Sequence, residues 1–386
     1  MPVFYLLNEK IKPVKAEPVI FALHFQNGKA REVVQPGRIP GLGPGGRRFE
    51  SCPPDTKESC DEQDSLFKTT SMHIVVTGGA GFIGSNLVKS LYAVYPGIKI
   101  TCIDNFDPFY SAAIKQHNIS HFRQTQGFSL INTDIATTSS SNLVSLIPEP
   151  VDVIVHMAAK AGVRPSIENP MAYQQVNVIG LQNMLEFAKS TGVKQFVFAS
   201  SSSVYGINDH FPWKEDEQLL PISPYAMTKL AGEMMGHVYS KLFGIRFIAL
   251  RFFTVYGPGQ RPDLAIHKFI KAILKGESIT MYGTGSTSRD YTYIEDALQG
   301  ISNSISRLKG FNIYNIGESR KVLLSEVIET IESAIGKKAI REYLPFQPGD
   351  VNATYADITK ARKELDYNPS FDFRKGIAEF IRWKLA

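Results

Sequence analysis

A serine cluster and a tyrosine–lysine pair are the residues whose types and spacing could do chemistry. The segment Phe198–Gly206 reads Phe-Ala-Ser-Ser-Ser-Ser-Val-Tyr-Gly, and Tyr225 stands four residues before Lys229. Residues four apart share one face of a helix, and an ammonium group beside a phenol lowers the pKa of that phenol. We therefore expect Tyr225 to take a proton from a substrate hydroxyl near neutral pH, with Ser201 hydrogen-bonded to both.

Neither pattern is specific alone, because serine runs are often flexible loops and Tyr-x-x-x-Lys occurs by chance on helices. The serine cluster, however, ends an apolar run, and Ser-Pro-Tyr opens a helical pattern. Both also follow a nucleotide-binding pattern. That order favours a catalytic site.

The nucleotide-binding pattern is a glycine-rich turn between an expected strand and an expected helix. His73–Thr77 is apolar and β-branched, and helical spacing of apolar residues runs through Ser85–Tyr95. Between them, Gly78 allows a tight turn, Gly81 lets the backbone approach a pyrophosphate, and Gly84 allows close helix packing. The helix N-terminus would offer N–H donors to phosphate.

An acidic residue follows at the spacing that a dinucleotide site requires. The second expected strand, Ile98–Ile103, leads to Asp104, 20 residues after Gly84. A carboxylate there would hold the adenosine ribose diol and disfavour a 2′-phosphate, which predicts NAD rather than NADP. Asp134, just beyond the expected strand Phe128–Asn132, could accept from the adenine amine.

Further strands are expected at Val151–His156 and Gln195–Ala199. Repeated strand–helix units predict an α/β Rossmann fold, a doubly wound parallel sheet, with a smaller C-terminal α/β substrate lobe. We expect the Rossmann domain at residues 72–250. Residues 251–386 should form mainly the substrate lobe, including residues 262–276 and 321–334, and return partly to the sheet.

From Met72 to Ala386 the sequence resembles the nucleotide-sugar epimerases of the extended short-chain dehydrogenase/reductase family. The resemblance rests on the glycine turn, the serine segment and the Tyr-x-x-x-Lys pair. It implies Ser201, Tyr225 and Lys229 as catalytic residues, Asn177 as a structural position, and bound NAD. It implies that NAD is contacted by Gly78, Gly81, Phe82, Ile83, Gly84, Asp104, Asn105, Asp134, Ile135, Ala158, Ala159, Lys160, Tyr225 and Lys229.

The residues before Val-Tyr-Gly separate the reactions of the resembled enzymes. Dehydratases carry an Asp-Glu pair there and UDP-glucuronate decarboxylases a Glu, whereas this chain has Ser202 and Ser203. The resemblance therefore implies 4-epimerisation of a UDP-sugar through a 4-keto intermediate, without net use of NAD.

Three segments, residues 158–166, 251–262 and 347–357, resemble UDP-glucuronate 4-epimerases. The resemblance implies the following substrate contacts: Ser202, Ser203 and Thr254 to the sugar carboxylate, Arg289 to the diphosphate, Arg261 to the diphosphate or ribose, and Asp350 to the uridine ribose. Lys160 replaces a usual Gln, and Pro165 replaces a common aromatic residue. A UDP-glucose or UDP-N-acetylglucosamine 4-epimerase therefore stays an alternative, as does a non-catalytic NAD-binding sensor.

Composition excludes several other classes of protein. The 386 residues carry a net charge of +5, too little to indicate a nucleic-acid partner, and no apolar run is long enough for a membrane helix. The three cysteines show neither metal-ligand spacing nor a disulfide framework. We expect a cytoplasmic enzyme without a metal, and by resemblance a homodimer formed through helices at residues 173–189 and 224–242.

Residues 1–71 differ from the rest of the chain. Residues 37–46 are rich in proline and glycine, and no helical or strand period is visible in the segment. One interpretation is a disordered tail. The other, which we favour, is that Met72 is the true start, because the segment Arg47–Cys52 can be encoded by a self-complementary stem resembling the T-arm of a transfer RNA gene.

Overall fold

The computed structural model describes residues 72–307, 309–345 and 351–386. The expectations for residues 1–71 and for Asp350 lie outside the described residues. None of the described helices is long and apolar enough to cross a membrane.

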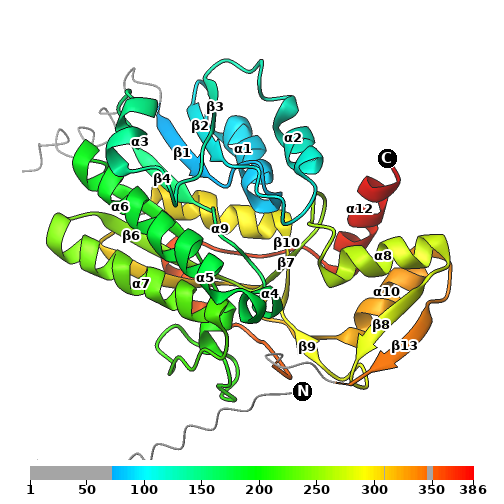
Figure 1. The fold of residues 1–386 in the computed structure, drawn as a ribbon. Coiled ribbons are helices and arrows are strands. Elements are labelled where there is room, and N and C mark those ends of the chain that lie inside the picture. Colours follow the sequence, from blue (N-terminus) through cyan, green and yellow to red (C-terminus); the bar gives the residue numbers. More distant parts are fainter. Residues whose placement is uncertain (1–71, 308, 346–350) are drawn as a thin grey trace, which may run out of the picture. The chain divides into compact units, whose positions relative to one another are not determined.

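A seven-stranded parallel sheet lies at the centre, in the order β11-β6-β5-β4-β1-β2-β3 (Figure 1). Its strands are β1 (His73–Thr77), β2 (Lys99–Asp104), β3 (Phe128–Asn132), β4 (Val153–His156), β5 (Gln195–Ser201), β6 (Arg246–Phe252) and β11 (Phe311–Ile316). The strand order reverses at β1, which is the switch point where ligands bind in open α/β sheets. The predicted doubly wound Rossmann fold is confirmed.

Helices cover both faces of this sheet. On one face α1 (Phe82–Val94) packs against α2 (Ala112–Ser120) and α9 (Ile294–Ser306), which contacts α11 (Thr359–Leu365). On the other face α6 (Gly180–Thr191) packs against α3 (Ser140–Leu146) and α7 (Pro224–Phe243). The β-strand period of two explains how one strand serves both faces, because Ile74 and Val76 join one core cluster and Val75 the other.

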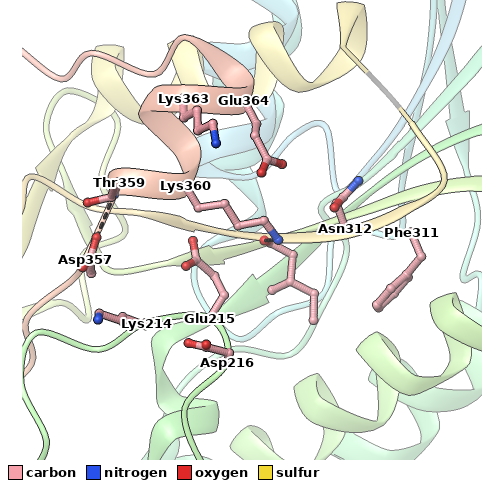
Figure 2. A pocket seen from close by; sticks show the side chains of 11 residues that line it. Lys214, Glu215, Asp216, Phe311, Asn312, Asp357, Thr359, Lys360, Lys363 and Glu364 are labelled. Carbon is pink, nitrogen blue, oxygen red and sulfur yellow. Dashed lines mark hydrogen bonds between the residues drawn. The ribbon is translucent and has the colours of Figure 1, made fainter.

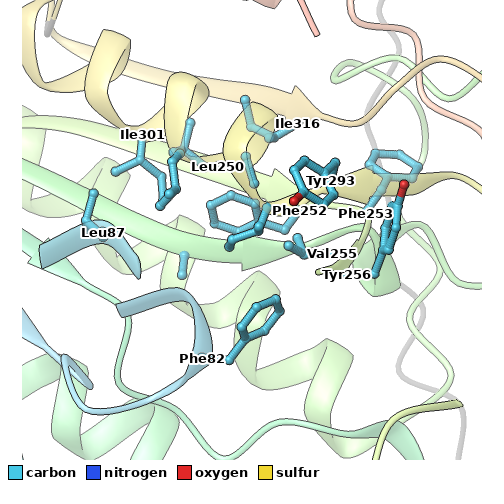
Figure 3. Close-up of a cluster of buried hydrophobic side chains, with 14 of the residues drawn as sticks. Phe82, Leu87, Leu250, Phe252, Phe253, Val255, Tyr256, Tyr293, Ile301 and Ile316 are labelled. Atoms are coloured by element: carbon cyan, nitrogen blue, oxygen red, sulfur yellow. The ribbon is translucent and has the colours of Figure 1, made fainter. Parts of the chain in front are cut away.

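The core on the α1 face brings together segments far apart in sequence. Figure 3 shows Leu87 of α1 with Leu250 of β6, Ile301 of α9 and Ile316 of β11. Each of these side chains is fully buried. Burial of such a side chain stabilises a fold by about 1.5–3 kcal/mol. The burial of Ile316 therefore helps to hold β11 in the sheet, although β11 comes late in the chain.

The segment after β4 contains short helices that spacing did not predict. α4 (Val163–Glu168) and α5 (Pro170–Tyr173) precede a π-helical turn, Gln174–Ile179, which runs into α6. The predicted helix at residues 173–189 is therefore interrupted in its winding. π-turns often occur at functional sites, and this one carries Asn177.

The smaller lobe follows β6. It contains α8 (Ala265–Lys275), β8 (Ser278–Tyr282), α10 (Leu324–Ile335), β13 (Ile340–Leu344) and α12 (Phe373–Leu385), with β8 and β13 paired (Figure 1). Two further strand pairs lie between the lobe and the sheet: β7 (Thr254–Tyr256) with β10 (Tyr291–Tyr293), and β9 (Ser288–Arg289) with β12 (Val322–Leu323).

Candidate active site

The glycine turn after β1 forms one wall of a cleft. Gly78 has a φ of +67°, and a Cβ there would lie 2.7 Å from the backbone nitrogen of Ala158. A Cβ on Gly84 would lie 2.2 Å from the carbonyl oxygen of Gly78. Gly84 therefore allows the close helix packing that we expected, and the segment that α1 approaches is the glycine turn.

Gly81 leaves room for a ligand. A Cβ there would meet only the carbonyl oxygen of Gly78 at 3.2 Å and the Tyr110 hydroxyl at 3.9 Å. Gly81 also precedes the first residue of α1, so unbonded N–H groups of the helix start face the cleft edge. This arrangement fits a pyrophosphate.

Asp104 ends β2 beside this turn and is buried. Its carboxylate accepts hydrogen bonds from the backbone N–H of Ala80 (3.1 Å) and of Phe106 (2.8 Å). The Lys115 ammonium lies 3.8 Å away. The carboxylate is thus oriented by the fold and lines the cleft.

The loop after β4 is held in place by Asn177. The Asn177 amide accepts from the Lys160 N–H (2.8 Å) and donates to the Lys160 carbonyl (3.0 Å) and to the Thr228 hydroxyl (2.9 Å). One side chain of the π-turn therefore ties this loop to α7. The inferred structural role of Asn177 agrees with these contacts.

Two adjoining cavities, of about 340 and 100 Å³, collect the residues that we assigned to NAD. The larger is lined by Gly78, Gly81, Phe82, Ile83, Gly84, Asp104, Ala158, Ala159, Tyr225 and Lys229. The smaller adds Asn105, Asp134, Ile135 and Lys160. Strand ends scattered through the sequence thus meet at one edge of the sheet.

Ser201, Tyr225 and Lys229 lie together in the larger cavity. Ser201 ends β5 and caps a 3₁₀ helix, Ser202–Tyr205, while Tyr225 lies in the first turn of α7 after the N-cap Ser223. The Ser201 hydroxyl donates to the Ser203 hydroxyl at 3.1 Å. The Lys229 ammonium donates to the carbonyl of Ala199 at 2.7 Å.

The pKa of Tyr225 differs from our expectation that Lys229 lowers it. Burial raises the pKa of Tyr225 above its ordinary value, although the hydrogen bond with Ser201 and the charge of Arg261 lower it. Lys229 makes no such contribution, since its ammonium is turned to Ala199 and lies 5.9 Å from the centre of the Tyr225 ring. Burial lowers the pKa of Lys229 itself to about 7.

A further cavity of about 150 Å³ contains the residues that we assigned to the sugar. Ser202, Ser203, Thr254 and Arg289 line it, and none of the described residues lining it is Asp or Glu. Thr254 lines the larger cavity as well. This cavity, which we call the sugar cavity after the residues that it collects, therefore meets the cleft at Thr254.

Arg261, which we assigned to the substrate diphosphate or ribose, lies apart from Ser202, Ser203 and Arg289. It lines the two cofactor cavities, not the sugar cavity, and its guanidinium pairs with Asp263 at 2.9 Å. Spacing also missed Tyr110 and Lys115, which line both cofactor cavities. They stand in residues 105–115, a segment of mixed aromatic and polar residues with no motif that could have identified them.

A further groove lies away from these residues. It has a volume of about 740 Å³ and runs between β11, α11 and the loop Lys214–Asp216 (Figure 2). None of the described residues that line it is one we assigned to a site. Its three lysines face four carboxylates, so it offers no region of one charge to a phosphate ligand. Among the described residues, no group of His, Cys, Asp or Glu could hold a metal ion.

A family model described as GDP-mannose 4,6 dehydratase matches residues 75–380. An uncharacterized protein of Methanocaldococcus jannaschii is 42% identical over 314 residues, 81% of this chain and 96% of that protein. The UDP-glucuronate 4-epimerase of Thermodesulfobacterium geofontis is 37% identical over 313 residues, 81% of this chain and 95% of that protein.

Among solved structures, the UDP-glucuronic acid 4-epimerase of Bacillus cereus, in complex with UDP-glucuronic acid and NAD, superposes with a TM-score of 0.77. It is 36% identical, and the match covers 82% of this chain and all (100%) of that one. The chain belongs to the GDP-mannose 4,6 dehydratase family of extended short-chain dehydrogenases/reductases.

Replacing Lys229 by Met should stabilise the NAD-free protein at pH 7 by about 1–3 kcal/mol, because the fold must bury an ammonium group without a carboxylate partner. The folded pKa of Lys229 is about 7, whereas its ordinary value is 10.5. The gain should be full below pH 7 and shrink as the pH rises towards 10.5, where the unfolded lysine also loses its proton. Urea unfolding measures it.

Lys189→Met, at an exposed lysine on α6, is the control and should change stability by less than about 0.5 kcal/mol. A loss of stability in Lys229→Met at pH 7, or a gain that grows with pH, contradicts the burial of a costly charge.

Proposed function

From its family and its site, we propose that the protein interconverts UDP-glucuronate and UDP-galacturonate by NAD-dependent 4-epimerisation. The observation that carries this proposal is the hydroxyl-lined sugar cavity, which adjoins Ser201 and Tyr225 and shares Thr254 with the cofactor cleft. The relatives named as UDP-glucuronate 4-epimerases support it.

The residues of the cleft fit NAD. Gly81 leaves space beside the start of α1, and Asp104 presents an oriented carboxylate that suits a ribose diol and opposes a 2′-phosphate. When bound, NAD supplies a hydride acceptor for C4 of the sugar and returns the hydride to the other face.

Tyr225 takes the proton of the 4-hydroxyl as the hydride leaves, and returns it in the second half of the cycle. Ser201 forms hydrogen bonds with both that hydroxyl and Tyr225, and so keeps the two groups aligned. The phenol needs help to ionise, because the protein alone raises its pKa. Lys229 binds the nicotinamide ribose after its ammonium leaves the carbonyl of Ala199, to which it donates in the NAD-free protein.

Ser202, Ser203 and Thr254 bind the sugar carboxylate through charge-assisted hydrogen bonds. The 4-keto sugar is a β-keto acid, which loses carbon dioxide when its carboxylate bond aligns with the carbonyl π-system. A fixed carboxylate suppresses this loss. The serines also leave no carboxylate for the acid–base step of dehydration, although the family model is named for a dehydratase.

The remaining substrate contacts are proposals of the same kind. Arg289 lines the sugar cavity and suits a diphosphate. Arg261 lines the cofactor cleft, and we propose that it contacts the substrate diphosphate or ribose from there. Asp350 is assigned to the uridine ribose.

A UDP-glucose or UDP-N-acetylglucosamine 4-epimerase is the second candidate. Lys160 and Pro165 replace the residues usual in UDP-glucuronate 4-epimerases. Lys160 lies in the loop after β4, and Pro165 lies in α4. A non-catalytic NAD-binding sensor is the candidate from another class. A sensor has no use for a buried lysine beside an oriented Ser–Tyr pair, so we favour the enzyme.

We further propose a cytoplasmic homodimer. On α7, Met227, Met234, Val238 and Leu242 are 38–69% exposed and form one stripe at helical spacing. Met171 of α5 and Ile179 of the π-turn are 74% and 43% exposed, and α5 and the π-turn both pack against α7. A continuous exposed apolar stripe usually marks an interface.

The purified protein should convert UDP-glucuronate into UDP-galacturonate, followed by proton NMR of the anomeric signals. Ser202→Ala should raise KM for UDP-glucuronate about tenfold, the effect of losing about 1.4 kcal/mol of charge-assisted bonding. Its activity on UDP-glucose, if any, should not change. The double variant Ser202→Ala/Thr254→Val should release some UDP-pentose as a by-product. Such a product would show that the hydrogen bonds to the sugar carboxylate suppress decarboxylation.

Two variants complete this test. Ser203→Ala should lower kcat as well, because Ser203 also accepts the Ser201 hydrogen bond. Tyr225→Phe should abolish turnover while NAD still raises the melting temperature. Conversion of UDP-glucose alone would move the proposal to the second candidate, and an active Tyr225→Phe protein would remove Tyr225 from the reaction.

Val238→Glu should split the dimer, because a carboxylate in an apolar interface is costly to bury. Light scattering coupled to size exclusion should give twice the chain mass for the wild type and one chain mass for the variant. Val94→Glu, at a valine of α1 that is 54% exposed, is the matched control and should remain dimeric. A wild type of one chain mass contradicts the dimer.

A further inference from the structure

The segment between β2 and α2 crosses the cofactor cleft. Residues 105–110 leave Asp104 at the end of β2 and line the smaller cofactor cavity through Asn105, Asp107, Phe109 and Tyr110. The Tyr110 hydroxyl lies 3.9 Å from the position that a Cβ of Gly81 would take. The segment therefore reaches from the acidic strand end to the glycine turn.

Two polar contacts fasten this segment to other strand ends. The Asn105 amide donates to the Asp134 carboxylate beyond β3 at 3.0 Å, and the Lys160 ammonium donates to the Asp107 carboxylate at 3.0 Å. Lys160 belongs to the loop after β4, so the two contacts tie the segment after β2 to the ends of β3 and β4, which lie on opposite sides of β2 in the sheet. The guanidinium of Arg261 also lies 5.3 Å from the centre of the Phe109 ring.

The segment is shaped before any ligand binds. Side-chain oxygens accept from backbone N–H groups two residues on, at Asp104–Phe106, Asn105–Asp107 and Asp107–Phe109. Such turns fix a loop without a regular element. Phe106 has a φ of +51°, a left-handed conformation that costs free energy in a non-glycine residue and must be held by its surroundings.

The Lys160–Asp107 pair is well placed to hold the segment closed. Both side chains are about a quarter exposed (24% and 27%), so water screens them less than a surface pair. The hydrogen bond and charge of Lys160 help to hold the pKa of Asp107 below its ordinary value despite partial burial. Asp107 therefore stays ionised at neutral pH and can keep its contact with Lys160.

We propose that residues 105–110 form a strap over the cofactor cleft, that the Lys160–Asp107 ion pair latches it, and that opening of the latch sets the rate of NAD release. A ligand beneath the strap can leave only after Asp107 parts from Lys160. An epimerase needs such retention, because the same cofactor must wait while the oxidised sugar turns. Lys160 thus acts on the cofactor through Asp107. The inference rests on the NAD site of the proposed function, but not on its substrate.

The test loads the full chain with NADH, mixes it with excess NAD, and follows the loss of bound NADH fluorescence by stopped flow. Lys160→Gln and Asp107→Asn should each release NADH about fivefold faster, equivalent to about 1 kcal/mol. The double variant should be no faster than either single variant, because one latch is lost in all three. Hydrogen exchange at the amides of residues 107 and 109 should quicken in each.

Lys338→Gln is the matched control, since Lys338 forms an ion pair of similar length with Glu332 (2.9 Å) in the smaller lobe; its release rate should be unchanged. Faster release in Lys160→Gln alone would mean that Lys160 holds the cofactor directly and would overturn the latch. Increases in release rate that add in the double variant would also overturn the latch. So would an unchanged release rate in both single variants when their melting temperatures are unaltered.

The two proposals fail separately. Faster release in the latch variants of a protein that converts no UDP-sugar would keep the strap and reject the epimerase. Conversion of UDP-glucuronate with unchanged release in the latch variants would keep the epimerase and reject the strap.

Discussion

The arrangement of the active site depends on one buried ion pair. Arg251 of β6 and Glu233 of α7 are at most 1% exposed, and they form two hydrogen bonds of 2.8 and 2.9 Å. The Ser200 hydroxyl donates to the same carboxylate, and Arg251 donates to the Tyr205 hydroxyl. Removing either charge would leave the other buried and unpaired, at a cost of about 3–5 kcal/mol. The pair therefore ties the end of β5 to α7, and so holds Ser201, next to Ser200, against Tyr225 and Lys229.

Around this pair, burial disfavours the charged forms of three titratable side chains. His156, at the end of β4, is neutral because burial lowers its pKa to about 3, and burial likewise lowers the pKa of Lys229 to about 7. Burial raises the pKa of Tyr225. The buried side chains Tyr225 and Lys229 therefore respond strongly to a charge brought by a ligand, because electrostatic interactions are strong where water is excluded. Ser202, Ser203 and Thr254 line the neighbouring cavity, in which none of the described lining residues is a carboxylate; this lining suits the anionic sugar of the proposed function.

Short-range patterns predicted much of this, because they follow from local rules. β-Branched runs located β1 to β5, and the 20-residue spacing located Asp104 at the edge where Gly78 and Ala158 meet. The orientation of Lys229 could not be predicted, since its partner is a backbone carbonyl 30 residues away. The contact of Asn177 in the π-turn with Lys160 joins residues 17 apart, and the Lys160–Asp107 contact joins residues 53 apart, so neither could be predicted. The position of Arg261 could not be predicted either, because it depends on how a loop folds. Motifs identify residues that meet a ligand, whereas the contacts that hold those residues are set by tertiary packing.

The central claim is that the hydride removed from C4 returns to C4 of the same sugar, with Tyr225 exchanging only the hydroxyl proton. The most direct test supplies UDP-glucuronate with deuterium at C4 in ordinary water and analyses the product by NMR and mass spectrometry. The account predicts UDP-galacturonate that retains the deuterium at C4, with all six carbons of the sugar intact. Loss of the label to water, or a labelled UDP-pentose as the main product, would contradict it.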